Sequence, residues 1–548
     1  MSILPAMPVD PRSTAPVELL ELRVLDGANR FFSVPAMKLE FGAGRPGVAD
    51  KAAAVAGDAV RQIRAGLGLP IPRLATRRSA DGRRAAIAFP WQRRTLDQAI
   101  AEAATRIAIG EGSLSGELSA LRSVAPGSRP ALPSPRCPVV AITGTNGKST
   151  TTRLVAHIAT GAGHRVGMTN SDGIYVGGTL VEAGDWTGFG GAGRVLADPG
   201  ISLAVLETAR GGILLRGIGH RANDVSVVTN VSPDHLGLQG IDTLDELAEV
   251  KAAVVRITRR TGWTVLNAQD PRAWEMRRAT RAQVYPFSLD PDLPAVGEAL
   301  ARGGRAAILR RGWLVLERAG QPPARVVRAA DVPITVAGHA RHNIANALAA
   351  AATADALGIP LERIAAGLRS FGRDDASNPG RLNLWERAGV LAIVDFAHNE
   401  EGLRSLLDVC RALLGPGPDR GALRLAVGTA GDRTDAILHQ IGRLAGAAAR
   451  DLVICEKRHY LRGRDLAAMN EILRAGARQA GYRGEIEAYP TELASLEALL
   501  SRASAGDVVA VMTHVERTEI GDWLAGAGFG RVSPERVAEL VGRATRGA

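Results

Sequence analysis

The 548-residue sequence has little cysteine, little lysine and few aromatic residues, and it has no long uninterrupted apolar run. Its three cysteines, Cys137, Cys410 and Cys455, lie far apart and do not have the spacing of metal ligands. An odd number of scattered cysteines argues against a disulfide framework and favours reduced thiols, as in the cytoplasm.

No segment is apolar for long enough to predict a membrane span. Polar residues interrupt the apolar stretch 344–357, which therefore predicts a buried helix. Residues 1–10 have neither a basic start nor a sustained apolar segment, so they do not resemble a secretory signal. With 46% apolar and 22% charged residues, the composition predicts a soluble globular protein of several domains.

Aromatic residues make up only 4% of the chain, and no basic run is flanked by aromatics, which argues against a nucleic-acid binder. The formal net charge is nevertheless +11. Two explanations stay open: a surface whose cations are mostly arginine, and an acidic substrate. Nucleic-acid binding would require a steep dependence of DNA affinity on salt.

Lysine is rare among the 67 basic residues. The five lysines are Lys38, Lys51, Lys148, Lys251 and Lys457. A chain that carries nearly all its positive charge as arginine retains lysine where a compact primary amine is needed. Two of the five fall within the motifs described below.

A proline-rich segment, residues 126–138, has five prolines in thirteen positions and predicts a linker. It separates residues 1–125, which we predict to be a small α+β domain, from the rest of the chain. That first domain combines a strand-like start at 18–25 with a helical pattern at 96–109. Its residues carry no recognisable chemistry by themselves.

After the linker, short apolar runs alternate with helical stretches, which is typical of parallel sheets covered by helices on both faces. We predict two successive α/β domains, residues 139–376 and 377–548, with the boundary between 374 and 380. The predicted strands are residues 139–142, 203–206, 225–228 and 264–266, then 391–394, 423–427, 452–454 and 508–512.

The segment 137–152, CPVVAITGTNGKSTTT, combines a buried strand, a glycine turn and a helix start, as phosphate sites require. Gly144 and Gly147 permit close approach, Lys148 can reach the β- and γ-phosphates, and the Ser149 hydroxyl can ligate Mg²⁺. The usual first glycine of a P-loop is replaced by Ile142, so this is a shorter form. The predicted phosphate-binding residues are Gly144, Thr145, Asn146, Gly147, Lys148, Ser149 and Thr150.

The form GTNGKST resembles the P-loop of the Mur ligase superfamily, and further motifs follow in that family's order. Glu207 in LETARGGIL resembles its acidic Mg²⁺ ligand, and His235 in TNVSPDHLG its second metal-binding residue. Lys251 in AEVKAAV occupies the position of the lysine that many members carbamylate. An uncharged amine can take up CO₂ to become a metal-bridging carboxylate; an unmodified surface lysine on a helix is the alternative. The implied metal ligands are Ser149, Glu207, His235 and Lys251.

Side-chain amides follow in VLNAQDP and GHARHNIANALAAA, at Asn267, Asn343 and Asn346. Such amides can donate to and accept from an adenine edge at once. The resemblance implies that Asn346 is the adenine contact, with Asn343 beside it.

The predicted C-terminal domain contributes motifs of its own. Arg381 in NPGRLN resembles the arginine that reaches the nucleotide phosphates from this domain. Asp395 and His398 in VDFAHNEEGL resemble the family's DYAHNP segment, whose aspartate holds the ribose. Glu400 replaces the usual proline of that segment. The resemblance implies a catalytic set of Lys148, Glu207, His235, Lys251 and Arg381.

Within the superfamily, long stretches resemble the Mur-ligase-like half of cyanophycin synthetase: TNSDGIYVGG, GDWTGFGGAGRVLADP, LETARGGILLRGIG, DHLGLQGIDTLDELAEVKA and GTAGDRTDAILHQIGRLAG. The opening ELRVLDGANRFFSVPAMKLEF resembles that family's N-terminal segment. Such enzymes join arginine to aspartate side-chain carboxylates. Their ATP-grasp module, which extends the polyaspartate backbone, has no room between the N-terminal segment and the P-loop here, so the implied activity is the Mur-type half alone.

The resemblance therefore implies a P-loop ATPase domain, a Rossmann-like C-terminal domain and an ATP-dependent carboxylate–amine ligase that uses Mg²⁺ and forms an acyl phosphate. Its partners would be a small amino acid and a carboxylate acceptor such as polyaspartate, without nucleic acid or membrane; a homo-oligomer is only a family expectation. The alternatives are a folate or poly-γ-glutamate ligase, a peptidoglycan-precursor ligase, and a non-catalytic ATP-binding partner of a polymerase. Trp186, Thr187 and Arg210 are candidates for the substrate cleft, with packing an equal alternative for Trp186.

Overall fold

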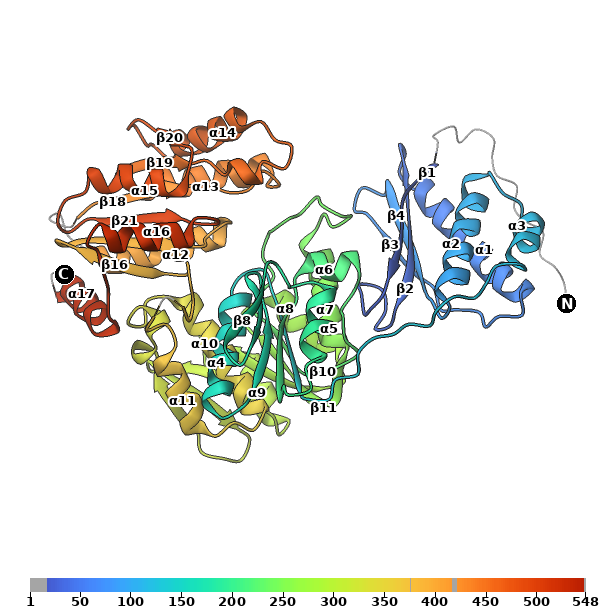
Figure 1. Cartoon of the computed structure of the whole chain (residues 1–548), viewed down its shortest axis with the longest axis horizontal. Helices are drawn as coiled ribbons and strands as arrows, with labels where there is room; N and C mark the ends of the chain where they lie inside the picture. The colour runs from blue at the N-terminus through green and yellow to red at the C-terminus, as the bar shows by residue number, and fades with distance from the viewer. Residues whose placement is uncertain (1–16, 375, 416–420, 547–548) are drawn as a thin grey trace.

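The computed structural model describes residues 17–374, 376–415 and 421–546, so the prediction for residues 1–10 lies outside the described part. Three β-sheets follow one another along the chain. Figure 1 shows the first sheet at one end of the molecule (blue), the last at the other (orange to red), and the largest between them. None of the helices in these described ranges has both the length and the apolar character needed to cross a bilayer.

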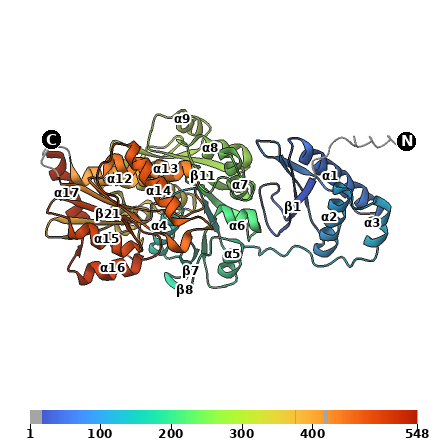
Figure 2. The same cartoon turned by 90° about the horizontal axis from the view of Figure 1, so that it is seen from above.

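The N-terminal unit is a four-stranded antiparallel sheet in the order β1-β2-β4-β3, covered by three helices. Its strands are β1 (Val17–Leu25), β2 (Ala36–Ala43), β3 (Ala75–Arg78) and β4 (Arg84–Pro90), and its helices are α1 (Val48–Gly66), α2 (Arg94–Ile109) and α3 (Leu114–Leu121). The strand expected at 18–25 and the helix expected at 96–109 are both present. Residues 126–138 contain no helix or strand, and Figure 2 shows this extended connection from α3 to the central sheet.

The central sheet has eleven strands in the order β15-β14-β13-β12-β11-β10-β5-β9-β6-β7-β8. They are β5 (Val139–Thr143), β6 (Val166–Thr169), β7 (Gly173–Val176), β8 (Thr179–Ala183), β9 (Leu203–Glu207), β10 (Asn223–Val228), β11 (Thr258–Asn267), β12 (Gln283–Ser288), β13 (Arg305–Arg310), β14 (Trp313–Arg318) and β15 (Ala324–Arg328). The seven strands from β13 to β6 are parallel, while β14, β15, β7 and β8 pair antiparallel at the two edges. The predicted parallel sheet is therefore correct for the seven interior strands but not for the four strands at the edges.

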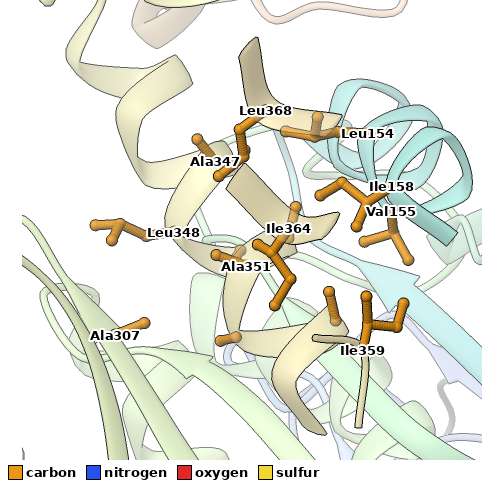
Figure 3. Close-up of a cluster of buried hydrophobic side chains, with 14 of the residues drawn as sticks. Leu154, Val155, Ile158, Ala307, Ala347, Leu348, Ala351, Ile359, Ile364 and Leu368 are labelled. Atoms are coloured by element: carbon orange, nitrogen blue, oxygen red, sulfur yellow. The ribbon is translucent and has the colours of Figure 1, made fainter. Parts of the chain in front are cut away.

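Helices cover both faces of the central sheet. They are α4 (Lys148–Gly161), α5 (Phe189–Leu196), α6 (Arg210–Leu215), α7 (Leu244–Arg256), α8 (Pro271–Glu275), α9 (Pro294–Ala301), α10 (Arg341–Ala356) and α11 (Leu361–Ser370). Figure 3 shows Leu154 and Ile158 of α4 packed with Ala347 and Ala351 of α10 and Leu368 of α11. The alanine-rich α10 is buried along most of its length, as expected for residues 344–357.

The C-terminal sheet has seven strands in the order β20-β19-β18-β21-β17-β16-β22. They are β16 (Asn383–Arg387), β17 (Val390–Asp395), β18 (Leu423–Val427), β19 (Asp451–Cys455), β20 (Ala488–Tyr489), β21 (Val508–Met512) and β22 (Gly530–Arg531). Its helices are α12 (Glu400–Leu414), α13 (Asp435–Ala448), α14 (Leu466–Gln479), α15 (Glu492–Ser501), α16 (Arg517–Gly526) and α17 (Pro534–Arg546). The five strands from β20 to β17 are parallel, which matches the α/β expectation.

The pairing of β5 with its neighbours positions the site. Ile142 pairs with Glu207 at the end of β9, and Thr143 pairs with Val228 at the end of β10. Because these strands are parallel, the segments that follow them emerge at one edge of the sheet, where ligands of α/β proteins usually bind. The loop 144–147 therefore leaves β5 beside Glu207.

Candidate functional site

A cleft of about 890 Å³ lies at this edge of the central sheet, and the C-terminal unit forms part of its wall. Every site residue expected from the sequence lines it: Gly144, Thr145, Asn146, Gly147, Lys148, Ser149, Thr150, Glu207, His235, Lys251, Asn267, Asn343, Asn346, Arg381, Asp395 and His398. Segments more than 250 residues apart in the sequence are thus brought into one cleft. The contacts that each of these residues makes are described in turn below.

The loop before α4 can be formed only with glycine at two positions. Gly147 has a φ of +81°, and a Cβ there would lie 2.3 Å from Oδ1 of Asn346. Gly144 has a φ of +152°, and its Cβ would lie 1.8 Å from Oγ1 of Thr229. Both side-chain oxygens occupy space that any larger residue would need, so the loop lies directly against β10 and α10.

Asn230, which was not singled out from the sequence, holds this loop in place. Its Oδ1 accepts from the backbone N–H of Thr145 over 3.2 Å and of Asn146 over 2.9 Å. Its Nδ2 donates to the carbonyl oxygen of Asn146 over 3.1 Å. One sequence feature could have indicated Asn230: it is a polar residue two positions after the buried strand 225–228, within the motif TNVSPDHLG.

Glu207 has the properties of a metal ligand. Its Oε2 is buried and has no hydrogen-bond partner. Burial raises the pKa of this carboxyl, while Lys148 and Ser149 partly offset the effect. Nowhere in the described ranges do three or more His, Cys, Asp or Glu side chains form a cluster that could hold a metal by itself. The donor set of Glu207 and the Ser149 hydroxyl fits Mg²⁺, which binds few protein oxygens and takes the rest from phosphates and water.

Lys148 and Lys251 both contact backbone carbonyl oxygens of the glycine loop. Nζ of Lys148 donates to the oxygen of Thr145 over 2.8 Å, and Nζ of Lys251 donates to that of Gly144 over 2.6 Å. Lys251 is 3% exposed on α7, so the surface-lysine alternative is wrong. Burial, and then the charge of Lys148, hold the pKa of Lys251 well below its usual range, which favours the uncharged amine that reacts with CO₂.

Arg381 reaches the glycine loop from the C-terminal unit. Its Nη2 lies 3.3 Å from Oγ of Ser149, to which it donates, and its guanidinium stacks over the ring of Phe396 at 4.4 Å. Asp395 orients this segment, because its two oxygens accept from the backbone N–H of Leu382 and of Ala397. Asp395 thus lines the cleft while it holds the turn that carries Arg381.

His235 contacts the C-terminal unit through one ring nitrogen. Its Nδ1 lies 2.9 Å from Oδ2 of Asp432 and 3.0 Å from Nη1 of Arg433. Arg433 is 4% exposed and pairs with Asp234 over 2.9 Å. Asp234, Asp432 and Arg433 were not predicted from the sequence as part of this site, although Asp432 and Arg433 belong to the motif GTAGDRTDAIL. Nε2 of His235 lies 3.7 Å from Oδ2 of Asp234, which is longer than a hydrogen bond, so it is the ring nitrogen that could bind a metal.

The amides of α10 are linked to one another and to the glycine-loop helix. Nδ2 of Asn346 donates to Oδ1 of Asn343 over 3.0 Å, and Nδ2 of Asn343 donates to the oxygen of Ile334 over 2.8 Å. The hydroxyl of Thr151 donates to Oδ1 of Asn346 over 3.4 Å. Each Nδ2 retains a second hydrogen, so a contact with a purine edge remains a prediction.

The C-terminal unit also touches the glycine loop through Asn146. Nδ2 of Asn399 donates to Oδ1 of Asn146 over 2.9 Å, and Nδ2 of Asn146 donates to Oε2 of Glu401 over 3.0 Å. The two units are therefore closed upon the loop. Of the three further candidates, Thr187 and Arg210 line the cleft, while Trp186 packs against an apolar cluster that includes Ala192 and Val195.

Two family models match this chain: the Mur ligase middle domain over residues 142–354, and the Mur ligase, glutamate ligase domain over residues 380–514. A cyanophycin synthetase of Trichormus variabilis is 38% identical over 379 residues, which are 69% of this chain and 41% of that protein. The chain thus spans about two fifths of the length of the curated cyanophycin synthetases that it matches.

A UDP-N-acetylmuramoyl-L-alanyl-D-glutamate–2,6-diaminopimelate ligase of Gloeobacter violaceus is 31% identical over 386 residues, which are 69% of this chain and 72% of that protein. Among solved structures, E. coli FolC in complex with DHPP and ADP has a TM-score of 0.51 and 18% identity, over 71% of this chain and 89% of that one. This last likeness concerns the fold alone.

Proposed function

This chain belongs to the Mur ligase family of ATP-dependent amide ligases, and we propose that it joins an acid to an amine through an acyl phosphate at the cleft described above. The observation that carries the proposal is the convergence of four groups. The glycine loop, the unpartnered oxygen of Glu207, the buried amine of Lys251 and the guanidinium of Arg381 line one cleft. Together these groups supply phosphate binding, metal binding and charge stabilisation.

Each group in the cleft has a separate role in this reaction. The glycine loop and Lys148 bind the triphosphate of ATP, and Arg381 neutralises charge that develops as the terminal phosphoryl group moves to the acid. Ser149 and Glu207 would hold Mg²⁺, which when bound reduces repulsion between the phosphate and carboxylate oxygens. Lys251, carbamylated, and His235 would provide further metal ligands. The closed C-terminal unit excludes water, which would otherwise hydrolyse the acyl phosphate before the amine attacks.

For substrates, we propose arginine or a similar amino acid as the amine and an aspartyl side-chain carboxylate as the acid. Support comes from the 38% identity to a cyanophycin synthetase and from the shared motifs around Trp186 and Glu207. The net charge of +11 also favours an acidic substrate. Residues 139–376 and 377–548 remain the proposed boundaries of the two catalytic domains.

The test is release of phosphate from MgATP by the full chain, measured with pairs of acids and amines. The acids are aspartate, a β-aspartyl peptide, polyaspartate, a glutamyl chain and a peptidoglycan precursor; the amines include arginine. Turnover that needs polyaspartate and arginine together, and is lost in Lys148→Ala, would support the proposal. Turnover with the glutamyl chain or the precursor would move the chain to those ligase classes. ATP binding without turnover in any pair would favour a non-catalytic ATP-binding partner.

A further inference from the structure

Asp172 joins the two units of the active-site cleft. It lies in the short connection between β6 and β7 and pairs with two arginines. Oδ1 accepts from Nη2 of Arg517, the first residue of α16 in the C-terminal unit, over 2.7 Å. Oδ2 accepts from Nη2 of Arg153, which lies on α4 directly after the glycine loop. One carboxylate thus ties the helix of the phosphate site to the C-terminal sheet.

Arg517 also packs against the turn that carries Arg381. The side chain of Arg517 lies so close to Gly380 that a Cβ there would be 2.3 Å from its Cδ. Both guanidinium groups lie near the ring of Phe396, that of Arg381 at 4.4 Å and that of Arg517 at 5.8 Å. A displacement of Arg517 would therefore displace Gly380 and Phe396, between which Arg381 is held.

The segment before Arg517 is itself rigidly held. The carboxylate of Glu492 accepts from the backbone N–H of His514 over 2.7 Å and of Glu516 over 2.9 Å. Lys457, one of the five lysines, forms a buried ion pair with Glu492 and donates to the carbonyl oxygen of Met512 over 2.6 Å. Arg517 therefore starts α16 from a fixed point on the C-terminal sheet.

Several guanidinium groups lie close together in the closed cluster. Arg153, Arg381 and Arg517 act on Asp172, and Lys148 and Arg381 act on Glu207. Asp185 acts on Glu207, and Arg381 also acts on Asp395. Burial favours the neutral form of Asp172, but these guanidinium groups outweigh it and hold its pKa below the usual range. Burial lowers the pKa of Arg381, and repulsion from Arg153 and Arg517 contributes to the same effect.

Two buried donors in this cluster have no hydrogen-bond partner, Nε of Arg153 and Nη1 of Arg517. Unpaired buried donors and like charges both destabilise the closed arrangement. A triphosphate bound at the glycine loop would bring negative charge and acceptor oxygens to these guanidinium groups. Closure is then favoured when the cleft holds a polyphosphate and disfavoured when it is empty of anions.

From these contacts we propose that Arg517 is a positioning residue: by docking on Asp172 when nucleoside triphosphate is bound, it closes the C-terminal unit and sets Arg381 against Ser149. The proposal rests on the ligase function proposed above. It assigns to Arg517 no contact with substrate. Its role is to hold Arg381 in the position where it stabilises charge, and to do so only when the phosphate site is filled.

The experiment compares the full-length wild type with Arg517→Met, which keeps the side-chain stem and removes the charge, Arg517→Lys, which restores a charge, and Asp172→Asn. The matched control is Arg536→Met, because Arg536 pairs with Glu386 and Glu539 inside the C-terminal unit. Small-angle X-ray scattering measures the radius of gyration with and without Mg²⁺ and a non-hydrolysable ATP analogue. Calorimetry measures the Kd of the analogue, and phosphate release measures kcat and KM for ATP.

We expect the wild type and Arg536→Met to contract when the analogue binds. Arg517→Met and Asp172→Asn should bind the analogue within about threefold of the wild-type Kd but not contract, and their kcat should fall about tenfold to a hundredfold. Arg517→Lys should recover a measurable part of the contraction and of kcat. Equal unfolding temperatures for Arg517→Met and Arg536→Met would exclude a merely structural effect.

Contraction and kcat at wild-type values in Arg517→Met would overturn the proposal. So would a large loss of analogue affinity with contraction retained, because Arg517 would then be a nucleotide contact. If Arg517→Met does not fold, the Asp172→Asn variant tests the same ion pair through its other member. If the wild type shows no turnover with any acid and amine, the ligase function fails, while the scattering measurement still decides whether this pair closes the cleft.

Discussion

Nζ of Lys251 lies 2.6 Å from the carbonyl oxygen of Gly144, although 107 residues separate them. The capping box of Thr243 and Glu246 starts α7, and two turns later Lys251 emerges beneath the glycine loop. A buried primary amine, with a pKa well below its usual range, therefore lies next to the first residue of the glycine loop.

Lys251→Gln should reduce amide formation about a hundredfold, because it removes the only group at this position that CO₂ can convert to a carboxylate. Wild-type turnover should fall in CO₂-free buffer and return with bicarbonate. The control is Lys51→Gln, since Lys51 is exposed on α1. Wild-type rates in Lys251→Gln, or no response of the wild type to bicarbonate, would contradict the carbamylation hypothesis.

Glu207→Gln should raise the Mg²⁺ concentration needed for half-maximal phosphate release by about tenfold or more, because the uncharged amide binds the ion weakly. Removal of Mg²⁺ with EDTA should abolish wild-type turnover. Burial raises the pKa of Glu207, so its protonation should begin at a higher pH than that of an ordinary glutamate, and the Mg²⁺ requirement should increase as the pH falls. A Mg²⁺ requirement in Glu207→Gln equal to that of the wild type would remove Glu207 from the metal site.

Gly147→Ala should destabilise the protein by about 1–3 kcal/mol and weaken ATP binding, because alanine is strained at a φ of +81° and its Cβ would meet Asn346. Calorimetry with the ATP analogue and thermal unfolding measure the two effects. Gly161→Ala is the control: a Cβ at that position on α4 meets no atom within 4 Å. Equal analogue affinity in the two variants would show that the loop tolerates a side chain.

Stability should depend on pH through His220. This ring is 1% exposed, and burial lowers its pKa from 6.5 to about 4. Between these values the unfolded chain binds a proton that the folded protein does not, so stability increases as the pH rises through this window. The loss on going from pH 6.5 to 4 should be about 3 kcal/mol from this residue.

Unfolding by urea at several pH values checks this prediction. His220→Gln should have a shallower dependence of the free energy of unfolding on pH over that window than the wild type. His459→Gln, at an exposed histidine, should keep the wild-type slope. Identical slopes for wild type and His220→Gln would show that His220 takes up a proton in the folded state.

Much of the fold could be predicted because local patterns and final structure agree. The runs 139–142 and 203–206 are continuously apolar, and 225–228 is interrupted only by Ser226. Such runs form interior strands of a parallel sheet. The antiparallel pairs β6–β7 and β13–β14 were not predicted. These strands have only four to six residues and show no regular alternation of buried and exposed positions, so their short sequences do not differ clearly from loops.

The sequence by itself determined the glycine turn between β5 and α4, since a strand, two glycines and a helix start are local features, and it determined the order of the motifs. Only the tertiary structure decided that Asn230 holds the loop, that Asp432 and Arg433 meet His235, and that Asp172 binds Arg517. These contacts join residues from 84 to 345 positions apart. Their partners are set by strand order and domain closure, which the spacing of residues along one chain does not encode.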